Sequence, residues 1–456
     1  MANKPDGTVE AKGLWRHPND LNAPEGSLSV ADEAVIFRDN VIDRRRGYSD
    51  CSTNLPNALP EQLFTHGDNI YLHMDGKIYQ QDGDCSWSNV TSLSNIDIYG
   101  RRFLVDGTNI FLNEDPTYFQ QRHSIRKLDL VARFVSTLAG TSVIENVFPT
   151  AVDGAAFVAR FSAPGDITIQ GNYIYVADFG SSTVRRINKS SGLTDTFAGV
   201  INTPGNVDGV GAAARFRSVQ AICSDSAYLW VLDVNSFFVM GFFGADTAFK
   251  RIEIATQDVV TIAASAYTAP FPKGFYGESG WTATGHDYCY FTNNSDFRYG
   301  PSSSDSLIGY SIVRIHKTTG VVDKEWSGLW ATSGYANGNA GASRYYRNKQ
   351  IWGDLAEGYL YVCDWNNHVI RKVALADGSS TLYAGTPGVA GTVDGIGAAA
   401  KFDFPAAIGG DATTIWVADR TTIRTIDRAT TAVTTYAFTD GNGFNGPISY
   451  DVEGPP

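Results

Sequence analysis

The feature that most constrains the fold of this chain is a glycine-rich decapeptide that occurs twice. VDGVGAAARF spans residues 207–216, and VDGIGAAAKF spans residues 393–402, 186 residues further on. At the same spacing, IYVADFGSSTVRRI at 174–187 matches LYVCDWNNHVIRKV at 360–373, without insertion. A match of this length indicates an internal repeat, so one repeat array accounts for most of the 456 residues.

Each repeat unit has the pattern of a small antiparallel sheet. An alternating aromatic and β-branched run predicts one strand, a run such as Ile-Arg-Lys-Val predicts the next, and a further strand ends in Ala-Gly. Three or four short strands in every repeat of roughly 40 to 70 residues, with no helix between them, are typical of a β-propeller blade.

The quoted segments, with FAG at 197–199 and YAG at 383–385, resemble NHL repeats. The resemblance implies an all-β chain in which residues 53–456 form a single β-propeller with NHL-like blades. Strand pairs near residues 70, 110, 174, 229, 289, 360 and 415 favour seven blades, and six remain if the segment at 63–90 is not a blade. The C-terminal FNGPISYDV is expected to pair with the first blade and close the ring, which removes exposed sheet edges.

The decapeptide itself is expected to be the turn that enters the inner strand of a blade, because Asp-Gly favours a turn. A phosphate-binding loop would end in Lys-Ser or Lys-Thr, and a calcium loop would carry alternating carboxylates. The decapeptide has neither feature.

Two residue types recur at fixed places in the repeat. A carboxylate or amide follows the second strand and is expected to cap backbone amides. An arginine in the next strand is expected to lay its aliphatic stem against the neighbouring blade. Because both columns recur around the ring, they are interpreted as structural. The first column is Glu114, Asp178, Asp233, Asn293, Asp364 and Asp419, and the second is Arg126, Arg185, Arg314, Arg371 and Arg424.

The sequence predicts no catalytic, cofactor-binding or metal-binding set. The NHL resemblance raises the option of a three-histidine zinc site, but of the seven histidines only His123 and His368 share a repeat position. A GxSxG hydrolase motif is absent. The five cysteines lack CxxC spacing, and three of them lie in apolar strand-like runs, which indicates buried thiols and synthesis in a reducing compartment.

The net charge of −12 argues against a broad basic surface for nucleic acid or anionic lipid. No run of 18 apolar residues occurs, and the N-terminal MANKPDGTVEAKG has no signal-peptide core, so no membrane anchor is expected.

Residues 1–52 lie outside the repeat and are expected to form a docking arm and a β-hairpin, in which AVIF and VIDR flank an Arg-Asp-Asn turn. The segment contains Pro24, Gly26, Ser27, Leu28, Ala31, Val35, Arg38, Val41, Arg45, Arg46 and Gly47. In these residues it resembles the N-terminal arm of tail nozzle (tail tubular protein B) proteins of short-tailed bacteriophages. It departs from the pattern of that arm at Ala34, where Asn is usual, and at Asn40, where Gly is usual. Clustered arginines bind carboxylates well, so docking to partners is expected at the arm and the hairpin end. The expected docking residues are Trp15, Pro24, Gly26, Arg44, Arg45 and Arg46.

The resemblance implies a structural protein of a bacteriophage tail, not an enzyme, that is made in the host cytoplasm. It is expected to form a homohexameric ring below the portal and adaptor, to contact adaptor and fibre proteins, and to let DNA pass without specific binding. One alternative is a receptor- or glycan-binding propeller at the tail tip, acting through loops 293–306 or 364–368. A less favoured alternative is an NHL-type lyase or lactonase that holds zinc or calcium.

Overall fold

The computed structural model divides the chain into two compact units, residues 1–95 with 131–135, and residues 96–130 with 136–456. It describes residues 103–113, 123–130, 134–141, 149–234, 247–264, 277–293, 310–329, 332–420 and 422–438, together with the backbone of short strands between residues 9 and 89. In this described part of the chain, no helix is long and apolar enough to cross a membrane.

The described strands of the first unit form a hairpin and a small sheet. Strands β2 (Val35–Arg38) and β3 (Val41–Arg44) pair antiparallel, with Arg38 opposite Val41. The sheet has the order β1-β4-β5-β6-β7. Its strands are β1 (Val9–Glu10), β4 (Pro60–His66), β5 (Asn69–Met74), β6 (Lys77–Gln81) and β7 (Trp87–Asn89).

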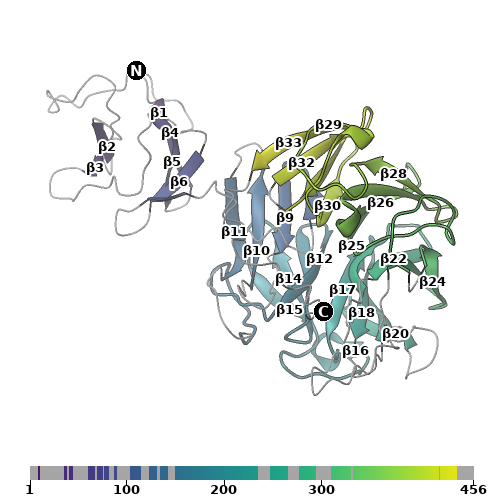
Figure 1. The fold of residues 1–456 in the computed structure, drawn as a ribbon. Coiled ribbons are helices and arrows are strands. Elements are labelled where there is room, and N and C mark those ends of the chain that lie inside the picture. The colour runs from purple at the N-terminus through teal and green to yellow at the C-terminus, as the bar shows by residue number, and fades with distance from the viewer. Residues whose placement is uncertain are drawn as a thin grey trace, which may run out of the picture. The chain divides into compact units, whose positions relative to one another are not determined.

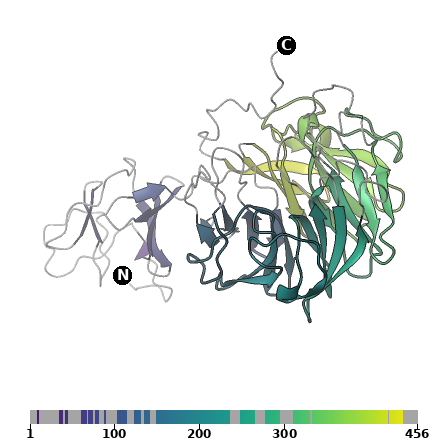
Figure 2. The same cartoon turned by 90° about the horizontal axis from the view of Figure 1, so that it is seen from below.

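The second unit contains six antiparallel sheets in its described residues, arranged around a common axis (Figures 1 and 2). We number these blades 1 to 6 in chain order. Within each blade, the four main strands follow one another along the chain from the inside of the ring to its outside.

The strands of the first three blades are as follows: in blade 1, β8 (Phe103–Asp106), β9 (Asn109–Asn113), β10 (His123–Asp129) and β11 (Phe134–Thr141); in blade 2, β12 (Pro164–Gln170), β13 (Tyr173–Asp178), β14 (Thr183–Asn188) and β15 (Thr194–Ala198); in blade 3, β17 (Val219–Ser224), β18 (Tyr228–Val234), β19 (Thr247–Glu253) and β20 (Asp258–Ala264).

The strands of the other three blades are as follows: in blade 4, β21 (Gly277–Trp281), β22 (Tyr288–Asn293), β23 (Ile312–His316) and β24 (Val322–Ser327); in blade 5, β25 (Asn348–Asp354), β26 (Tyr359–Asp364), β27 (Val369–Ala374) and β28 (Ser380–Ala384); in blade 6, β30 (Ala407–Gly410), β31 (Thr414–Ala418), β32 (Thr422–Asp427) and β33 (Ala432–Phe438).

The inner strands of neighbouring blades contact one another all the way round, and β30 of blade 6 returns to β8 of blade 1. Apolar side chains on both faces of the blades fill the spaces between them. Between blades 2 and 3, for example, Tyr175 and Val184 pack with Ile222 and Leu229, and Phe216 from the connecting loop joins them. The alternating strands of the sequence are therefore buried on both sides, as a closed six-bladed propeller requires.

The ring has six blades, the smaller of the two numbers that the sequence allowed. The strand pair near residue 70 belongs to β4–β7 of the first unit, so the boundary between the units falls at residues 95/96 rather than at 52/53. The segment at 63–90 carries neither the decapeptide nor the aspartate and arginine columns that join the parts of a blade. The predicted closing segment, FNGPISYDV at 444–452, lies outside the described residues.

The decapeptide leads into an inner strand and also extends the outer edge of the same blade. In blade 3, β16 (Gly209–Val210) pairs with the outer strand β20, and in blade 6, β29 (Gly395–Ile396) pairs with β33. The 3-10 turns η2 (Gly211–Ala213) and η4 (Gly397–Ala399) follow, and the chain then crosses to the inner strand. The repeated glycine-rich loop is thus a fifth strand and a crossover.

Candidate functional site

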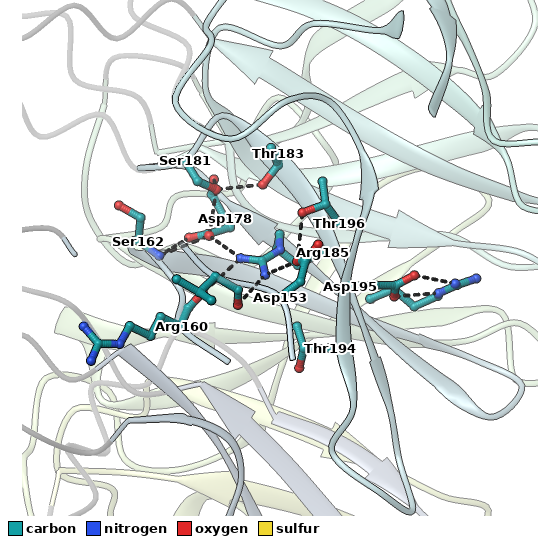
Figure 3. Close-up of polar contacts among 12 residues, drawn as sticks. Asp153, Arg160, Ser162, Asp178, Ser181, Thr183, Arg185, Thr194, Asp195 and Thr196 are labelled. Carbon is teal, nitrogen blue, oxygen red and sulfur yellow. Dashed lines mark hydrogen bonds and ion pairs between the residues drawn. The ribbon is translucent and has the colours of Figure 1, made fainter. Parts of the chain in front are cut away.

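In blade 2, a buried arginine joins the decapeptide-like loop 152–161 to the blade that this loop precedes (Figure 3). The Arg185 side chain has no exposed surface, and its Nη2 donates to Asp153 Oδ1 in the loop over 2.6 Å. Its Nη1 lies 3.5 Å from Oδ2 of Asp178, at the end of the second strand. Asp178 in turn accepts hydrogen bonds from the Ser162 N–H and the Ser181 hydroxyl.

The guanidinium of Arg185 therefore bonds to two carboxylates of its own blade, which the sequence analysis did not predict, and it lies 5.5 Å from the ring centre of Phe161. Its charge has carboxylate partners, and a buried charge is stable only where such partners are present.

Blades 3 and 6 repeat this arrangement. In blade 6, Arg424 Nη2 lies 2.6 Å from Asp394 Oδ1 of the decapeptide, and Nη1 lies 3.6 Å from Asp419 Oδ2. In blade 3, Lys250 Nζ lies 2.9 Å from Asp208 Oδ1. The VDG aspartates Asp153, Asp208 and Asp394 are therefore each the partner of a buried cation.

Blade 5 departs from this pattern at the loop position. Arg371 Nη1 lies 3.2 Å from Asp364 Oδ2, but Asn337 stands where the other blades have the VDG aspartate. The second guanidinium nitrogen, Nη2, donates instead to Ser380 Oγ and to the carbonyl of Ala336.

The strand register changes the membership of the arginine column. Lys250 of β19 occupies the same register position as Arg185 of β14. The sequence analysis did not include Lys250 because it considered arginine alone at this position. In β23 of blade 4 that position is Val313, which is fully buried. Arg314 lies one residue further along, on the opposite face of the strand, where it pairs with Asp323 at 3.1 Å. The long connection before β23 hid this one-residue offset, because it removed the fixed spacing that aligned the other copies.

Blades 1 and 4 carry the remaining predicted column residues. Arg126 lies half-buried at the expected register position of β10, and Asn293 ends β22 fully buried. Glu114 lies outside the described residues. Beside it, the Asn113 amide donates to the carbonyls of Pro164 and Gly165 and so links blade 1 to blade 2.

Asp233 of blade 3 is buried, and Lys250 stands at the position where blades 2, 5 and 6 have an arginine. Burial raises the pKa of Asp233 to about 6, although the N–H groups of Ser218 and Arg217 and the charge of Lys250 favour the carboxylate. Burial also raises the pKa of Asp364, against the opposing effect of Arg371. These carboxylates are held by internal donors, which makes them parts of the scaffold.

The two histidines that share a repeat position are both buried. Burial lowers the pKa of His123 to about 4. His368 has a left-handed backbone, with φ of 57°, and its Nδ1 accepts the N–H of Phe404. In the described ranges, no three His, Cys, Asp or Glu side chains gather as a metal site.

The loop at 364–368, one of the two loops expected to act in the glycan-binding alternative, is folded back onto blade 6. Trp365 is 7% exposed and His368 is 8% exposed. The 3-10 turn η3 (Trp365–Asn367) places both rings against Phe404, at 4.8 and 4.3 Å between ring centres. The other candidate loop, 293–306, lies outside the described residues beyond Asn293.

Two buried polar side chains near the axis connect the inner strands, and the sequence analysis missed both. In blade 2, Asp166 Oδ2 accepts the N–H of Ile222 in blade 3, over 2.8 Å, and the N–H of Gly280 in blade 4, over 3.3 Å. The first contact joins two neighbouring blades, and the second joins blades 2 and 4, which are not neighbours in the ring.

Gln350 occupies the same register position in blade 5, half a ring away. Its Oε1 accepts the N–H of Phe103 in blade 1 and that of Ile408 in blade 6, and its Nε2 donates to the Phe103 carbonyl. The signal in the sequence is a lone polar residue within an inner strand, which is hard to recognise without the partner strands.

The residues predicted for docking fall in the first unit. Arg44 ends β3 opposite Val35. The others lie outside the described residues: Trp15, Pro24, Gly26, Arg45 and Arg46.

Comparisons with known proteins find one repeat family and several solved structures of low sequence identity. Residues 164–184, which include β12 and β13, match the LVIVD repeat family. No curated protein matches the sequence.

Similar solved structures include a structural genomics protein of unknown function from Bacteroides thetaiotaomicron VPI-5482, at 15% identity over 87% of this chain and 93% of that chain, with a TM-score of 0.49. An auxiliary nutrient binding protein from Bacteroides ovatus ATCC 8483 has 14% identity over 83% of this chain and 91% of that chain, with a TM-score of 0.48. A chain of a nidogen/laminin complex has 12% identity over 71% of this chain and 93% of that chain, with a TM-score of 0.43.

Proposed function

We propose that this chain is a non-enzymatic structural protein of a bacteriophage tail, of the nozzle type. In this proposal the N-terminal unit docks onto neighbouring tail proteins and onto other copies of the chain. The NHL-like propeller forms the body of a homohexameric ring around the DNA exit channel, below the portal and adaptor.

The observation that carries the proposal is the position of the nozzle-like arm. The residues that resemble the arm belong to a compact unit of their own, residues 1–95 with 131–135, separate from the propeller. The segment that resembles the arm includes the β2–β3 hairpin, and three consecutive arginines, Arg44 to Arg46, begin at the last residue of β3. They form a local positive cluster in a chain of net charge −12. Such a cluster suits an acidic surface on another subunit, because guanidinium groups bind carboxylates in a bidentate manner.

The repeated charges of the propeller favour a structural role as well. Arg185, Lys250, Arg371 and Arg424 are fully buried and bonded within their own blades. These residues therefore support the loops and strands of the blades rather than meet a substrate.

Native mass spectrometry of the full chain tests the proposal. The expected result is a ring of the unaltered protein that dissociates when the three arginines are reversed together, in Arg44→Glu/Arg45→Glu/Arg46→Glu. The matched control is Arg160→Glu/Lys324→Glu, which changes exposed cations of the propeller and should leave the ring intact. A chain that stays monomeric at every concentration, or a ring that survives the triple reversal, would count against arm-driven assembly.

A further inference from the structure

We propose that the propeller contacts neighbouring copies of this chain through two exposed apolar surfaces, one at the outer side of blade 2 and one at the outer side of blade 6. The inference rests on the ring proposed above, and it names the propeller surfaces that meet within that ring. We call these surfaces the blade 2 edge, which is Val152, Phe157, Val158 and Leu193, and the blade 6 edge, which is Val393 and Ile396.

Both edges lie on the outermost backbone of their blades. In blade 6, Ile396 belongs to β29, which pairs with the outer strand β33. In blade 2, Gly154 of the equivalent loop exchanges two backbone hydrogen bonds with Thr194, the first residue of the outer strand β15, each over 2.9 Å. Leu193 directly precedes Thr194, and the Val158 side chain lies against Gly154. The blade 2 edge is therefore gathered around one backbone pairing.

The propeller scaffold does not require the large apolar residues of the blade 2 edge. Phe157 is 74% exposed and Val158 is 61% exposed, so burial within the blade does not account for them. At these two positions, blades 3 and 6 carry Ala212-Ala213 and Ala398-Ala399, and blade 5 carries Gly341-Ala342. Neighbouring apolar side chains that are exposed in this way are typical of a surface that binds a partner.

The size of the blade 2 edge indicates a contact that strengthens an assembly rather than one that forms it. Its four side chains expose on the order of 400 Å², about half of what one partner contributes to a stable interface. Two free propellers should therefore not associate through it. Copies that their N-terminal units hold in a ring have a high effective concentration, at which a small apolar contact adds stability. The surface thus fits a second copy of this chain.

The directions of the two edges fit a ring of six copies. Six blades in chain order divide one turn into steps of about 60°, so blades 2 and 6, on either side of blade 1, point outward about 120° apart. In a closed symmetric ring of six, the directions from one copy to its two neighbours also differ by about 120°. With the propeller axis parallel to the ring axis, the blade 2 edge of one copy faces the blade 6 edge of the next.

Blade 3 has a similar edge, but its direction does not fit such a ring. Val207 and Val210 are exposed to about the same extent as Val393 and Ile396. The fifth strands of blades 3 and 6 lie on opposite sides of the propeller, however, and contacts about 180° apart give an open row of copies (Figure 1). Contacts through blades 2 and 3, about 60° apart, would give a ring of three. The blade 3 edge therefore supplies a matched control.

Dilution of the full chain, followed by mass photometry, tests the inference by giving the concentration at which half of the rings have dissociated. Phe157→Ala/Val158→Ala gives blade 2 the residues that blades 3 and 6 carry, so this variant should fold. We expect this variant, and Val393→Ala/Ile396→Ala, each to raise the half-dissociation concentration by about tenfold or more. The control Val207→Ala/Val210→Ala should leave it unchanged.

Combining the two edge variants tests whether the edges meet each other. If they do, the combined variant should raise the half-dissociation concentration by clearly less than the product of the two separate factors. A full chain that forms no ring at any concentration would contradict the assembly proposed above, and this inference with it. A ring that forms but is unaffected by either edge variant would overturn this inference alone. Equal weakening by the blade 3 control, or independent effects of the two edges, would overturn the pairing of blade 2 with blade 6.

Discussion

Asp233 shows how the identity of one neighbour sets the charge state of a buried group. In blades 2, 5 and 6 an arginine lies between the strand-end aspartate and the loop, but in blade 3 Lys250 bonds to Asp208. Asp233 is left with two backbone N–H donors, and burial raises its pKa to about 6. At pH values between the ordinary aspartate pKa near 4 and about 6, Asp233 therefore holds a proton in the folded chain but not in the unfolded chain.

The stability that Asp233 contributes is therefore present at low pH and is lost as the pH rises through about 6. We predict that acidification from pH 7.5 to 5 adds about 1 to 1.5 kcal/mol more to the free energy of unfolding of the unaltered chain than to that of Asp233→Asn. Urea unfolding at both pH values measures this difference.

Asp225→Asn is the matched control for the Asp233 prediction. Burial acts to raise the pKa of Asp225, but hydrogen bonds from Lys317 and Trp230 outweigh it and hold this pKa below its ordinary value. Asp225 therefore stays ionised from pH 5 to 7.5. The same pH response in Asp233→Asn and in the unaltered chain would contradict the prediction.

Asn337 is the other informative single residue, because it stands where three blades have an aspartate. We predict that Asn337→Asp stabilises the protein by about 0.5 to 1 kcal/mol at neutral pH, by giving Arg371 a second carboxylate. Asp394→Asn makes the reverse change in blade 6, and it should destabilise the protein by about 1 to 2 kcal/mol because Arg424 is fully buried. Chemical unfolding measures the free energy of unfolding of both variants. Equal effects of the same sign would show that Asn337 and the VDG aspartates do not hold equivalent positions.

At the scale of strands and loops, the sequence predicted the repeated elements and missed the links between them. The alternating runs and the aspartate column are local patterns, and the structure places them in β13, β18, β26 and β31 with their strand-end turns. The partners of Asp166 and Gln350 lie in other blades, far away in the sequence, so no local pattern reveals them. Tertiary packing also decided that Trp365 is buried, because its contact is with blade 6.

Gln350 allows a direct test of these links. Gln350→Ala removes three hydrogen bonds to buried backbone groups of blades 1 and 6, so we predict a loss of about 2 to 4 kcal/mol in the free energy of unfolding. Gln220 is an equally buried glutamine of an inner strand, but its amide donates to Ser218 of its own blade. Gln220→Ala should therefore cost about 1 kcal/mol or less. A similar loss in both variants, measured by urea unfolding, would show that the axial links add nothing beyond burial.

At the scale of the whole molecule, the repeat predicted a propeller but left the blade number open between seven and six. The strand pair near residue 70 resembles a blade in its apolar alternation alone, and alternation is shared by any two-sided sheet. Blades 2 and 6 each join a loop aspartate, a buried arginine and a strand-end aspartate, whereas the sequence at 63–90 contains no arginine. The nozzle-like arm and the tail function stay predictions that rest on the resemblance.

The measurement that tests the account most directly is the native mass of the full chain beside a variant that lacks residues 1–95, with circular dichroism to follow unfolding. The propeller has six blades of its own, so the shortened chain should fold and unfold cooperatively as a monomer while the full chain forms a ring. A shortened chain that still forms the same ring would place assembly in the propeller. A shortened chain that does not fold would contradict the division into two units.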